Sequence, residues 1–216
     1  MSLTLYSYFR SSAAYRVRIA LNLKGLPYEV IPVHLVKDGG QQHQAAFQAI
    51  NPAELVPALG TGQQVLNQSL AIIEYLEELQ PKPALLPGNA LERAQIRALA
   101  LDIACDIHPL NNLRVLQYLS GTLQVSDDAK ATWYHHWIQQ GFDALEQRLS
   151  QSPSCGQFCF GDSPTLADCC LIPQLTNARR FNGEVSRWPT LTRIEANAMQ
   201  LSAFQQAAPQ QQVDAE

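Results

Sequence analysis

The first eighty residues alternate between the hydrophobic periods of strands and helices, and this alternation limits the fold more than any other feature. Residues 3–8 read as a short strand, and residues 13–24 carry apolar side chains at helical spacing before Gly25. Residues 28–35 are rich in Val and Ile and read as a second strand. A strand, a helix and a strand within about 30 residues form a βαβ unit, which predicts two parallel strands joined by a right-handed crossover.

The next segments extend this unit to the order β-α-β-α-β-β-α. The further elements expected are a short helix at 44–49, a hairpin of strands 56–59 and 64–66, and a helix at 69–79. With Val56-Pro57 before the third strand, this order suggests a thioredoxin-like domain over residues 1–81. A redox protein of that fold would carry Cys-x-x-Cys at the tip of the first helix. The tip here reads Ser11-Ser12-Ala13-Ala14, which excludes dithiol exchange.

A linker rich in proline, residues 81–88, precedes a change of pattern. From there on the periodicity is helical, which predicts an all-helical domain over residues 88–216 and the class α/β plus all-α. The helices expected are one from Leu91 to about Leu119 kinked at Pro109, one over 127–149, one starting at the capping box Thr165–Asp168, and shorter ones over 189–199 and 201–207. The tail from Pro209 is polar and is expected to fray.

Composition excludes several classes of protein. The net charge is -4, the pI is about 5.7, and no Lys/Arg run occurs, which argues against a nucleic-acid partner. No apolar run is long enough for a membrane span, and the start lacks a secretory signal. Five scattered cysteines form neither a disulfide framework nor a metal-ligand set. We therefore expect reduced thiols, no metal and a cytoplasmic location.

Six motifs in one order give the chain a resemblance to a known family. The stretch YSYFRSSAAYRVRIALNLKG, residues 6–25, resembles the signature of the zeta-class glutathione transferases, the maleylacetoacetate isomerase family. The other motifs are KDGGQQ (37–42), Asn51-Pro52 with LVPAL (55–59), NQSLAIIEYLEE (67–78), DIHPLNNL (106–113) and TLADCCLIPQ (165–174). The resemblance covers residues 3 to about 208. One departure is Ala13, where the family usually has cysteine.

The resemblance implies glutathione as cofactor, bound at the tip of the first helix. The free N–H groups and positive dipole end of a helix starting near Ser12 favour an anion such as a thiolate. The hydroxyls of Ser11 and Ser12 can donate hydrogen bonds to that thiolate. The alternative is that one of these serines only caps the helix, and both roles can coexist on neighbouring serines.

Four further residues are implied as glutathione contacts. By resemblance, Val56-Pro57 is a cis peptide that exposes the backbone of Val56 to the cysteinyl part of glutathione. Gln68 and Ser69 open the next helix and suit the γ-glutamyl carboxylate, and Gln42 resembles the contact to the glycyl end. The alternatives are an ordinary X-Pro turn at Val56 and a plain serine cap at Ser69.

The helical domain offers a polar and cationic set of residues. His108 and Asn112 are four apart, so they are expected on one face of the kinked helix, which in this family looks toward the bound thiol. Arg10, Arg114 and Arg180 form a candidate pocket for a substrate with two carboxylates. The alternative for Arg180 and its neighbour Arg179 is that they balance the helix dipole.

The implied activity is the glutathione-dependent cis–trans isomerisation of maleylacetoacetate in tyrosine and phenylalanine catabolism. A thiolate adds to the conjugated double bond, the bond rotates, and glutathione leaves unconsumed. The resemblance also implies a homodimer, with each cleft formed mainly between the two domains of one chain. The alternatives are a maleylpyruvate isomerase, a conjugating or dehalogenating transferase, and a non-catalytic interaction protein of the same fold.

Overall fold

The N-terminal unit is built on a mixed four-stranded sheet. A computed structural model describes residues 2–216 and divides into two compact units, one running to Leu85 and including Met199–Glu216, the other Leu86–Ala198. The strands are β1 (Leu3–Ser7), β2 (Tyr28–Pro32), β3 (Ala58–Gly60) and β4 (Val65–Asn67). Their order in the sheet is β2-β1-β3-β4, with β1 and β2 parallel and the other pairs antiparallel. The expected β-α-β-α-β-β-α order is confirmed.

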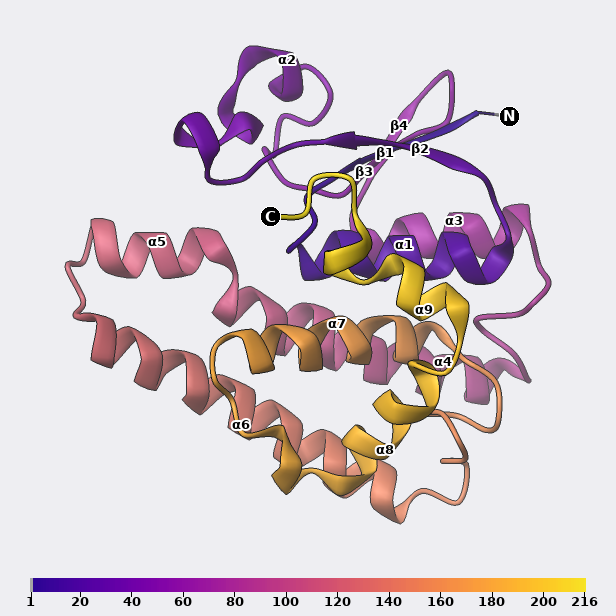
Figure 1. The fold of residues 1–216 in the computed structure, drawn as a ribbon. Helices are drawn as coiled ribbons and strands as arrows, with labels where there is room; N and C mark the ends of the chain where they lie inside the picture. Colours follow the sequence, from indigo (N-terminus) through magenta and orange to yellow (C-terminus); the bar gives the residue numbers. More distant parts are fainter. Residues whose placement is uncertain (1) are drawn as a thin grey trace. The chain divides into compact units, whose positions relative to one another are not determined.

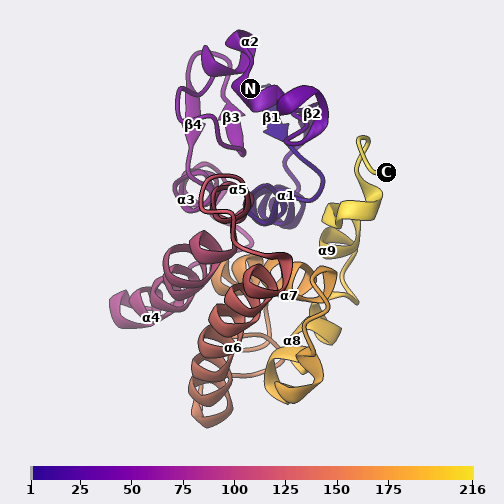
Figure 2. The same ribbon diagram turned by 90° about the vertical axis from the view of Figure 1, so that its left-hand side faces the viewer.

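Helices lie on both sides of this sheet. Figure 2 shows α1 (Ser12–Lys24) and α3 (Ser69–Leu79) together on one side, and the short α2 (Ala45–Gln48) on the other. Two 3-10 turns, Lys37–Gly39 and Gln41–His43, form the expected loop. The second strand ends at Pro32, earlier than the expected residue 35, because its neighbour β1 already ends at Ser7, the partner of Pro32.

The register of the strands brings four chain connections to one end of the sheet. Tyr6 near the end of β1 pairs with Ala58 at the start of β3, and Ala58 pairs with Asn67 at the end of β4. Ser7 pairs with Pro32 at the end of β2. The residues that follow β1, β2 and β4, and those that precede β3, therefore meet at the same edge.

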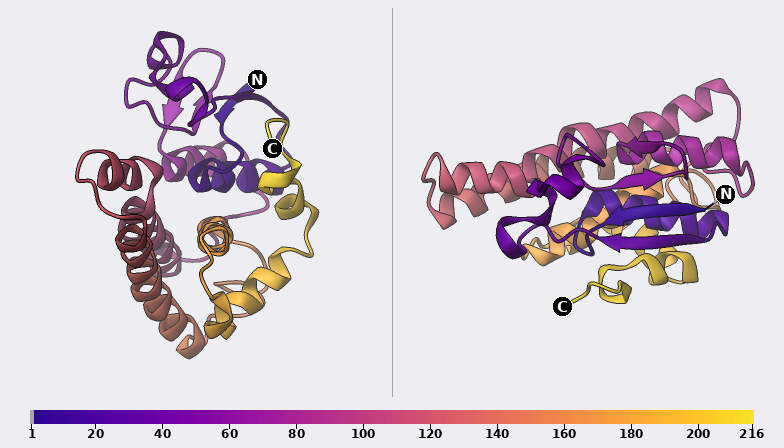
Figure 3. Two further views of the ribbon diagram at one scale, coloured as in Figure 1. Left: turned by 60° about the vertical axis from the view of Figure 1, so that its left-hand side comes forward. Right: turned by 90° about the horizontal axis from the view of Figure 1, so that it is seen from above.

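The second unit consists of helices packed around α7. Its main helices are α4 (Ala90–Leu101), α5 (Leu113–Gly121), α6 (Asp127–Gln151), α7 (Leu166–Arg180) and α8 (Pro189–Ala198). The helix α7 lies among the other helices of this unit (Figure 3) and contacts both α4 and α8. Its first ten residues are all buried. An all-helical second unit is confirmed.

The prediction of a single kinked helix from Leu91 to about Leu119 is wrong. After α4 the chain makes a wide π-helical turn (Asp102–Ile107) and a 3-10 turn (His108–Asn111), and then breaks at Asn112. The backbone of Asn112 is extended, and its side chain accepts a hydrogen bond from the N–H of Arg114 to start α5. The break has a local cause, because Pro109 lacks a donor for the preceding turn and Asn112 is a favourable N-cap.

The C-terminal residues pack on the N-terminal unit, whereas the expected helical domain ran to residue 216. The helix α9 (Ser202–Ala207) lies along α1, as Figure 1 shows, and the carbonyl of Ala207 accepts a hydrogen bond from Arg18 Nε at 2.9 Å. The tail from Pro209, which was expected to fray, makes specific contacts. The carboxylate of Asp214 accepts the N–H of Phe9 at 3.0 Å, and Glu216 forms an ion pair with Lys37 at 2.5 Å.

Three further findings concern membrane-spanning helices, cysteines and metal ligands. Within residues 2–216, none of the helices has the length and apolar character that crossing a membrane requires. The five cysteines are free thiols. The described part of the chain holds no cluster of three His, Cys, Asp or Glu side chains placed to bind a metal ion.

Candidate active site

The two serines at the tip of α1 have different environments. Ser11 is the N-cap, and its hydroxyl accepts a hydrogen bond from the N–H of Ala14 at 3.2 Å. Ser12 is the first helical residue and is buried. Among residues 2–216, none forms a hydrogen bond with the Ser12 hydroxyl. The cap role therefore falls to Ser11, and the Ser12 hydroxyl stays available at the positive end of the helix.

A buried arginine holds the backbone that leads to these serines. Arg18 donates to Ser7 Oγ at 3.0 Å and to the carbonyl of Phe9 at 3.1 Å. Burial lowers the pKa of Arg18 to about 10, so the guanidinium remains charged at neutral pH. Arg10, which follows Phe9 in the chain, is exposed. Its guanidinium carbon lies 4.7 Å from the centre of the Phe9 ring.

The connection before β3 supplies Val56. The Val56-Pro57 peptide bond is cis, as expected. Val56 is buried in a cluster with Tyr8, Phe9, Val33 and Phe47, which joins the connections after β1 and β2 to the one before β3. Val56 therefore lies at the same edge of the sheet as the tip of α1.

The start of α3 is built differently from a plain serine cap. The cap residue is Gln68, whose backbone has the left-handed φ of 66° and whose side chain makes no capping hydrogen bond. Ser69 is the first helical residue, and its buried hydroxyl accepts a hydrogen bond from Arg16 Nη1 at 3.2 Å. A positive φ at a residue other than glycine costs roughly 1 kcal/mol or more, and such residues cluster at functional sites. The plain-cap reading of Ser69 is wrong.

Gln42 is a buried side chain with an unsatisfied oxygen. Its Nε2 donates to the carbonyl of Leu35 at 3.4 Å, while its Oε1 has no hydrogen-bond partner within residues 2–216. A buried acceptor without a donor costs about 1–3 kcal/mol, so the position favours a ligand that brings an N–H group.

In the helical unit, His108 and Asn112 meet through the chain break rather than through helical spacing. The Nδ2 of Asn112 lies 3.2 Å from Nε2 of His108. The side chain of Arg114 is exposed on the first turn of α5. The expected proximity of His108 and Asn112 is confirmed, although the expected geometry is not.

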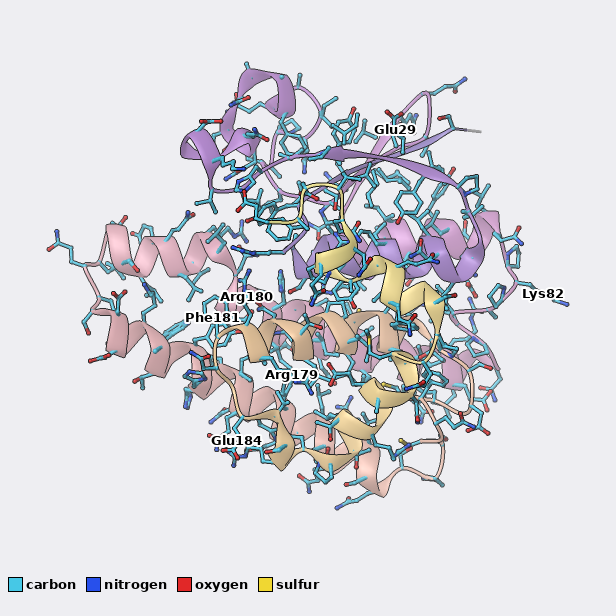
Figure 4. All side chains as sticks on the ribbon, viewed as in Figure 1. Glu29, Lys82, Arg179, Arg180, Phe181 and Glu184 are labelled. Atoms are coloured by element: carbon cyan, nitrogen blue, oxygen red, sulfur yellow. The ribbon has the colours of Figure 1, made fainter. Side chains whose placement is uncertain are left out.

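Arg179 and Arg180 are the last two residues of α7 (Figure 4). Arg179 forms an ion pair with Glu195 of α8, so it serves the packing of the helical unit. Arg180 is exposed, and its guanidinium carbon lies 4.8 Å from the centre of the Phe181 ring. The ring of Phe181 stacks on Tyr134 at 4.3 Å. Burial raises the pKa of Tyr134, whereas the charge of Arg180 opposes this shift.

The candidate residues thus form two sets, one in each unit. Arg10, Ser11, Ser12, Gln42, Val56, Gln68 and Ser69 belong to the N-terminal unit, and His108, Asn112, Arg114 and Arg180 belong to the helical unit. Sequence reasoning missed Arg16 and Arg18. A signal in the sequence is that both arginines alternate with the apolar residues Val17 and Ile19 in one helix. All four side chains are buried, so this stretch of the helix has no solvent-exposed face for the arginines.

Comparison with known proteins finds family matches in both parts of the chain. Residues 5–84 match the family model described as glutathione S-transferase, N-terminal domain, and residues 138–201 match glutathione S-transferase, C-terminal domain. A curated relative from Vibrio cholerae, named probable maleylacetoacetate isomerase, is 56% identical over 215 residues, covering 100% of this chain and 99% of the relative.

Two solved structures are similar over nearly their whole lengths. One is a holo maleylpyruvate isomerase, described as a bacterial glutathione S-transferase of the zeta class, with 49% identity, a TM-score of 0.95 and full coverage of both chains. The other is a maleylacetoacetate isomerase from Methylobacterium extorquens with bound malonate and glutathione, with 40% identity, a TM-score of 0.94 and 99% coverage of each chain. The chain therefore belongs to the glutathione S-transferase family, in its zeta class of maleylacetoacetate isomerases.

Proposed function

We propose that this protein catalyses the cis–trans isomerisation of a maleyl keto acid with glutathione as coenzyme. Maleylacetoacetate is the first candidate substrate. The observation that carries this is the tip of α1, which presents the Ser12 hydroxyl and no thiol at an edge of the sheet suited to an anionic peptide. The thiol must then come from the coenzyme. The names of the full-length relatives support the same activity.

The N-terminal residues fit glutathione part by part. The start of α3, with Ser69 and the strained Gln68, suits the γ-glutamyl carboxylate. The backbone of Val56 suits the cysteinyl part, which would pair with it like an added strand. The unsatisfied Oε1 of Gln42 suits an N–H group at the glycyl end. This assignment gives the buried Oε1 of Gln42 a hydrogen-bond donor.

Ser12 is the residue that we expect to lower the pKa of the thiol. When bound, glutathione supplies a thiolate that adds reversibly to the conjugated double bond and so allows it to rotate. The Ser12 hydroxyl would donate a hydrogen bond to this sulfur, and the free N–H groups at the start of α1 add a positive potential. Each unit by which the thiol pKa falls corresponds to about 1.4 kcal/mol.

Arg10, Arg114 and Arg180 would bind the charged ends of the substrate. All three side chains are exposed, and arginine stays charged at every relevant pH. Arg179 instead pairs with Glu195 of α8. The dicarboxylate malonate bound in the related structure supports a substrate with two carboxylates. His108 and Asn112, which belong to the helical unit, are candidates for hydrogen bonds to glutathione.

Maleylpyruvate is the second candidate substrate, because the structure with a TM-score of 0.95 is a maleylpyruvate isomerase. The deciding experiment measures the conversion of maleylacetoacetate and of maleylpyruvate, each with and without glutathione. We expect conversion only with glutathione and a higher kcat/KM for maleylacetoacetate. A higher kcat/KM for maleylpyruvate would reverse the order of the two candidates.

We further propose a cytoplasmic homodimer. Exposed apolar side chains on β4 and α4, namely Val65, Leu91 and Leu101, support burial against a second copy. The free thiols support a reducing compartment. Light scattering tests the dimer, and Leu101→Glu should shift the mass toward that of one chain. A wild-type mass of 23.9 kDa, that of a single chain, would contradict it.

A further inference from the structure

Arg16 joins α1 to the start of α3 in the interior of the N-terminal unit. Its side chain is 2% exposed, and its Nη1 donates to Ser69 Oγ at 3.2 Å. Ser69 is itself 6% exposed and is the first residue of α3. A buried positive charge thus lies directly behind the hydroxyl that opens this helix.

This contact fixes what the Ser69 hydroxyl can do. A hydroxyl has one proton to donate and two lone pairs, and one lone pair is used by the N–H of Arg16. The hydroxyl proton is therefore directed to another acceptor. The first N–H groups of α3 also lack helical partners, and the side chain of Gln68 does not cap them. The donors at this end of α3 are suited to an anion.

The neighbouring buried arginine shows a different pattern. Arg18 lies two residues further along α1 and donates to Ser7 Oγ and to the main-chain carbonyls of Tyr8, Phe9 and Ala207. These bonds hold together the end of β1, the residues that follow it and α9. Arg16 instead donates to the side chain of Ser69 at a helix N-terminus, where an approaching anion would meet its charge with little water between them.

We infer that Arg16 is a positioning residue for the γ-glutamyl carboxylate of glutathione, acting through Ser69. It orients the Ser69 hydroxyl as a donor to that carboxylate and adds a buried positive charge behind it. The inference rests on the proposed function, because it needs glutathione to bind at the start of α3. It deepens that function by assigning a role to an arginine that does not itself contact the ligand.

The test is the binding of two ligands, measured by isothermal titration calorimetry. S-methylglutathione reports binding without any thiol chemistry, and its decarboxylated analogue, with γ-aminobutyrate in place of the γ-glutamyl residue, lacks the carboxylate in question. We expect Arg16→Met to weaken S-methylglutathione binding about 10- to 100-fold, the range for a lost charge-assisted interaction. The same variant should bind the decarboxylated analogue within about twofold of wild type.

Arg16→Lys and a double-mutant cycle with Ser69→Ala extend the test. Lysine keeps the charge but not the fixed planar donor, so its affinity for S-methylglutathione should lie between those of wild type and Arg16→Met. The effects of Arg16→Met and Ser69→Ala should be much less than additive, because both remove one interaction. The lysine variant also keeps the test open if Arg16→Met does not fold.

The matched control is the pair Lys24 and Glu77, which also links α1 to α3 through a buried charge but lies at the C-terminal end of α1. Lys24→Met with Glu77→Gln should leave S-methylglutathione affinity within about twofold of wild type, whatever its effect on melting. Equal losses for both ligands in Arg16→Met, or no loss for either, would overturn the inference. If the wild type itself failed to bind S-methylglutathione, the proposed function would fail before the role of Arg16 was reached.

Discussion

The buried carboxylate of Asp168 predicts a large effect on stability. Asp168 is fully buried, and its oxygens accept three hydrogen bonds. The donors are the N–H of Cys159 at 2.8 Å, the N–H of Thr165 at 2.7 Å and the hydroxyl of Thr165 at 2.8 Å. These bonds join the loop before α7 to the first turn of that helix, which is the most buried helix of its unit.

Asp168→Ala leaves these three donors unsatisfied in the interior. At about 1–3 kcal/mol for each buried unsatisfied group, and allowing for water entry and incomplete additivity, we expect a loss of about 3–5 kcal/mol in the free energy of unfolding. For a chain of this size each kcal/mol lowers Tm by about 2–4 °C, so the expected decrease in Tm is about 10 °C. Urea unfolding and differential scanning calorimetry measure the two quantities.

Asp162 is the matched control. It is an exposed carboxylate that accepts one main-chain N–H, from Gln157 at 3.0 Å, in the same stretch of chain. Asp162→Ala should cost less than about 1 kcal/mol. If Asp168→Ala were no more destabilising than Asp162→Ala, the account of this loop and helix start would be refuted.

The same carboxyl makes the effect depend on pH. Burial raises the pKa of Asp168 above its usual value of 3.8, although the hydrogen bonds oppose this shift. The folded state therefore holds the proton more tightly than the unfolded state, and this contribution to stability decreases as pH rises from about 3.8 through the raised pKa. The stability difference between wild type and Asp168→Asn should be larger at pH 4 than at pH 7. A stability difference that stays constant with pH would show that the pKa of Asp168 is the same in the folded and unfolded states, and would contradict this prediction.

The remaining predictions concern the candidate active site. Ser12→Ala should raise the pKa of enzyme-bound glutathione, read from its thiolate absorbance, and lower kcat/KM about 10- to 150-fold, whereas Ser11→Ala should mainly cost about 1 kcal/mol of stability as a lost cap. An unchanged thiolate titration in Ser12→Ala would contradict this division of roles. Arg114→Met and Arg180→Met should raise KM for the dicarboxylate and leave the conjugation of an uncharged electrophile nearly unchanged. Equal losses on both substrates would remove the argument for a dicarboxylate pocket.

Local signals in the sequence predicted what depends on neighbouring residues. The βαβ order, the stop of α1 at Gly25 and the capping box at Thr165–Asp168 are all present in the structure. Each follows from the spacing of apolar side chains or from one capping interaction within a few residues. The family resemblance added the cis peptide at Val56-Pro57, which no local pattern requires.

The features that the sequence did not predict depend on contacts between distant segments. The C-terminal tail is held by the hydrogen bond from the N–H of Phe9 to the carboxylate of Asp214, two residues that are separated by almost the whole chain. The roles of Arg16 and Arg18 depend on α3, on the end of β1 and on α9, none of which a helical pattern reveals. One local feature was also not predicted, the break at Asn112, because a proline kink and a new N-cap leave almost the same apolar spacing.

In the proposed reaction, glutathione supplies the thiol and is returned unchanged. The most direct measurement follows the cis–trans conversion of maleylacetoacetate by proton NMR, using protein freed of small thiols and then supplied with glutathione at a small fraction of the substrate concentration. We expect no conversion above the uncatalysed rate before the addition, complete conversion after it, and full recovery of free glutathione at the end. Conversion at full rate without any added thiol, or consumption of glutathione in proportion to product, would contradict the account.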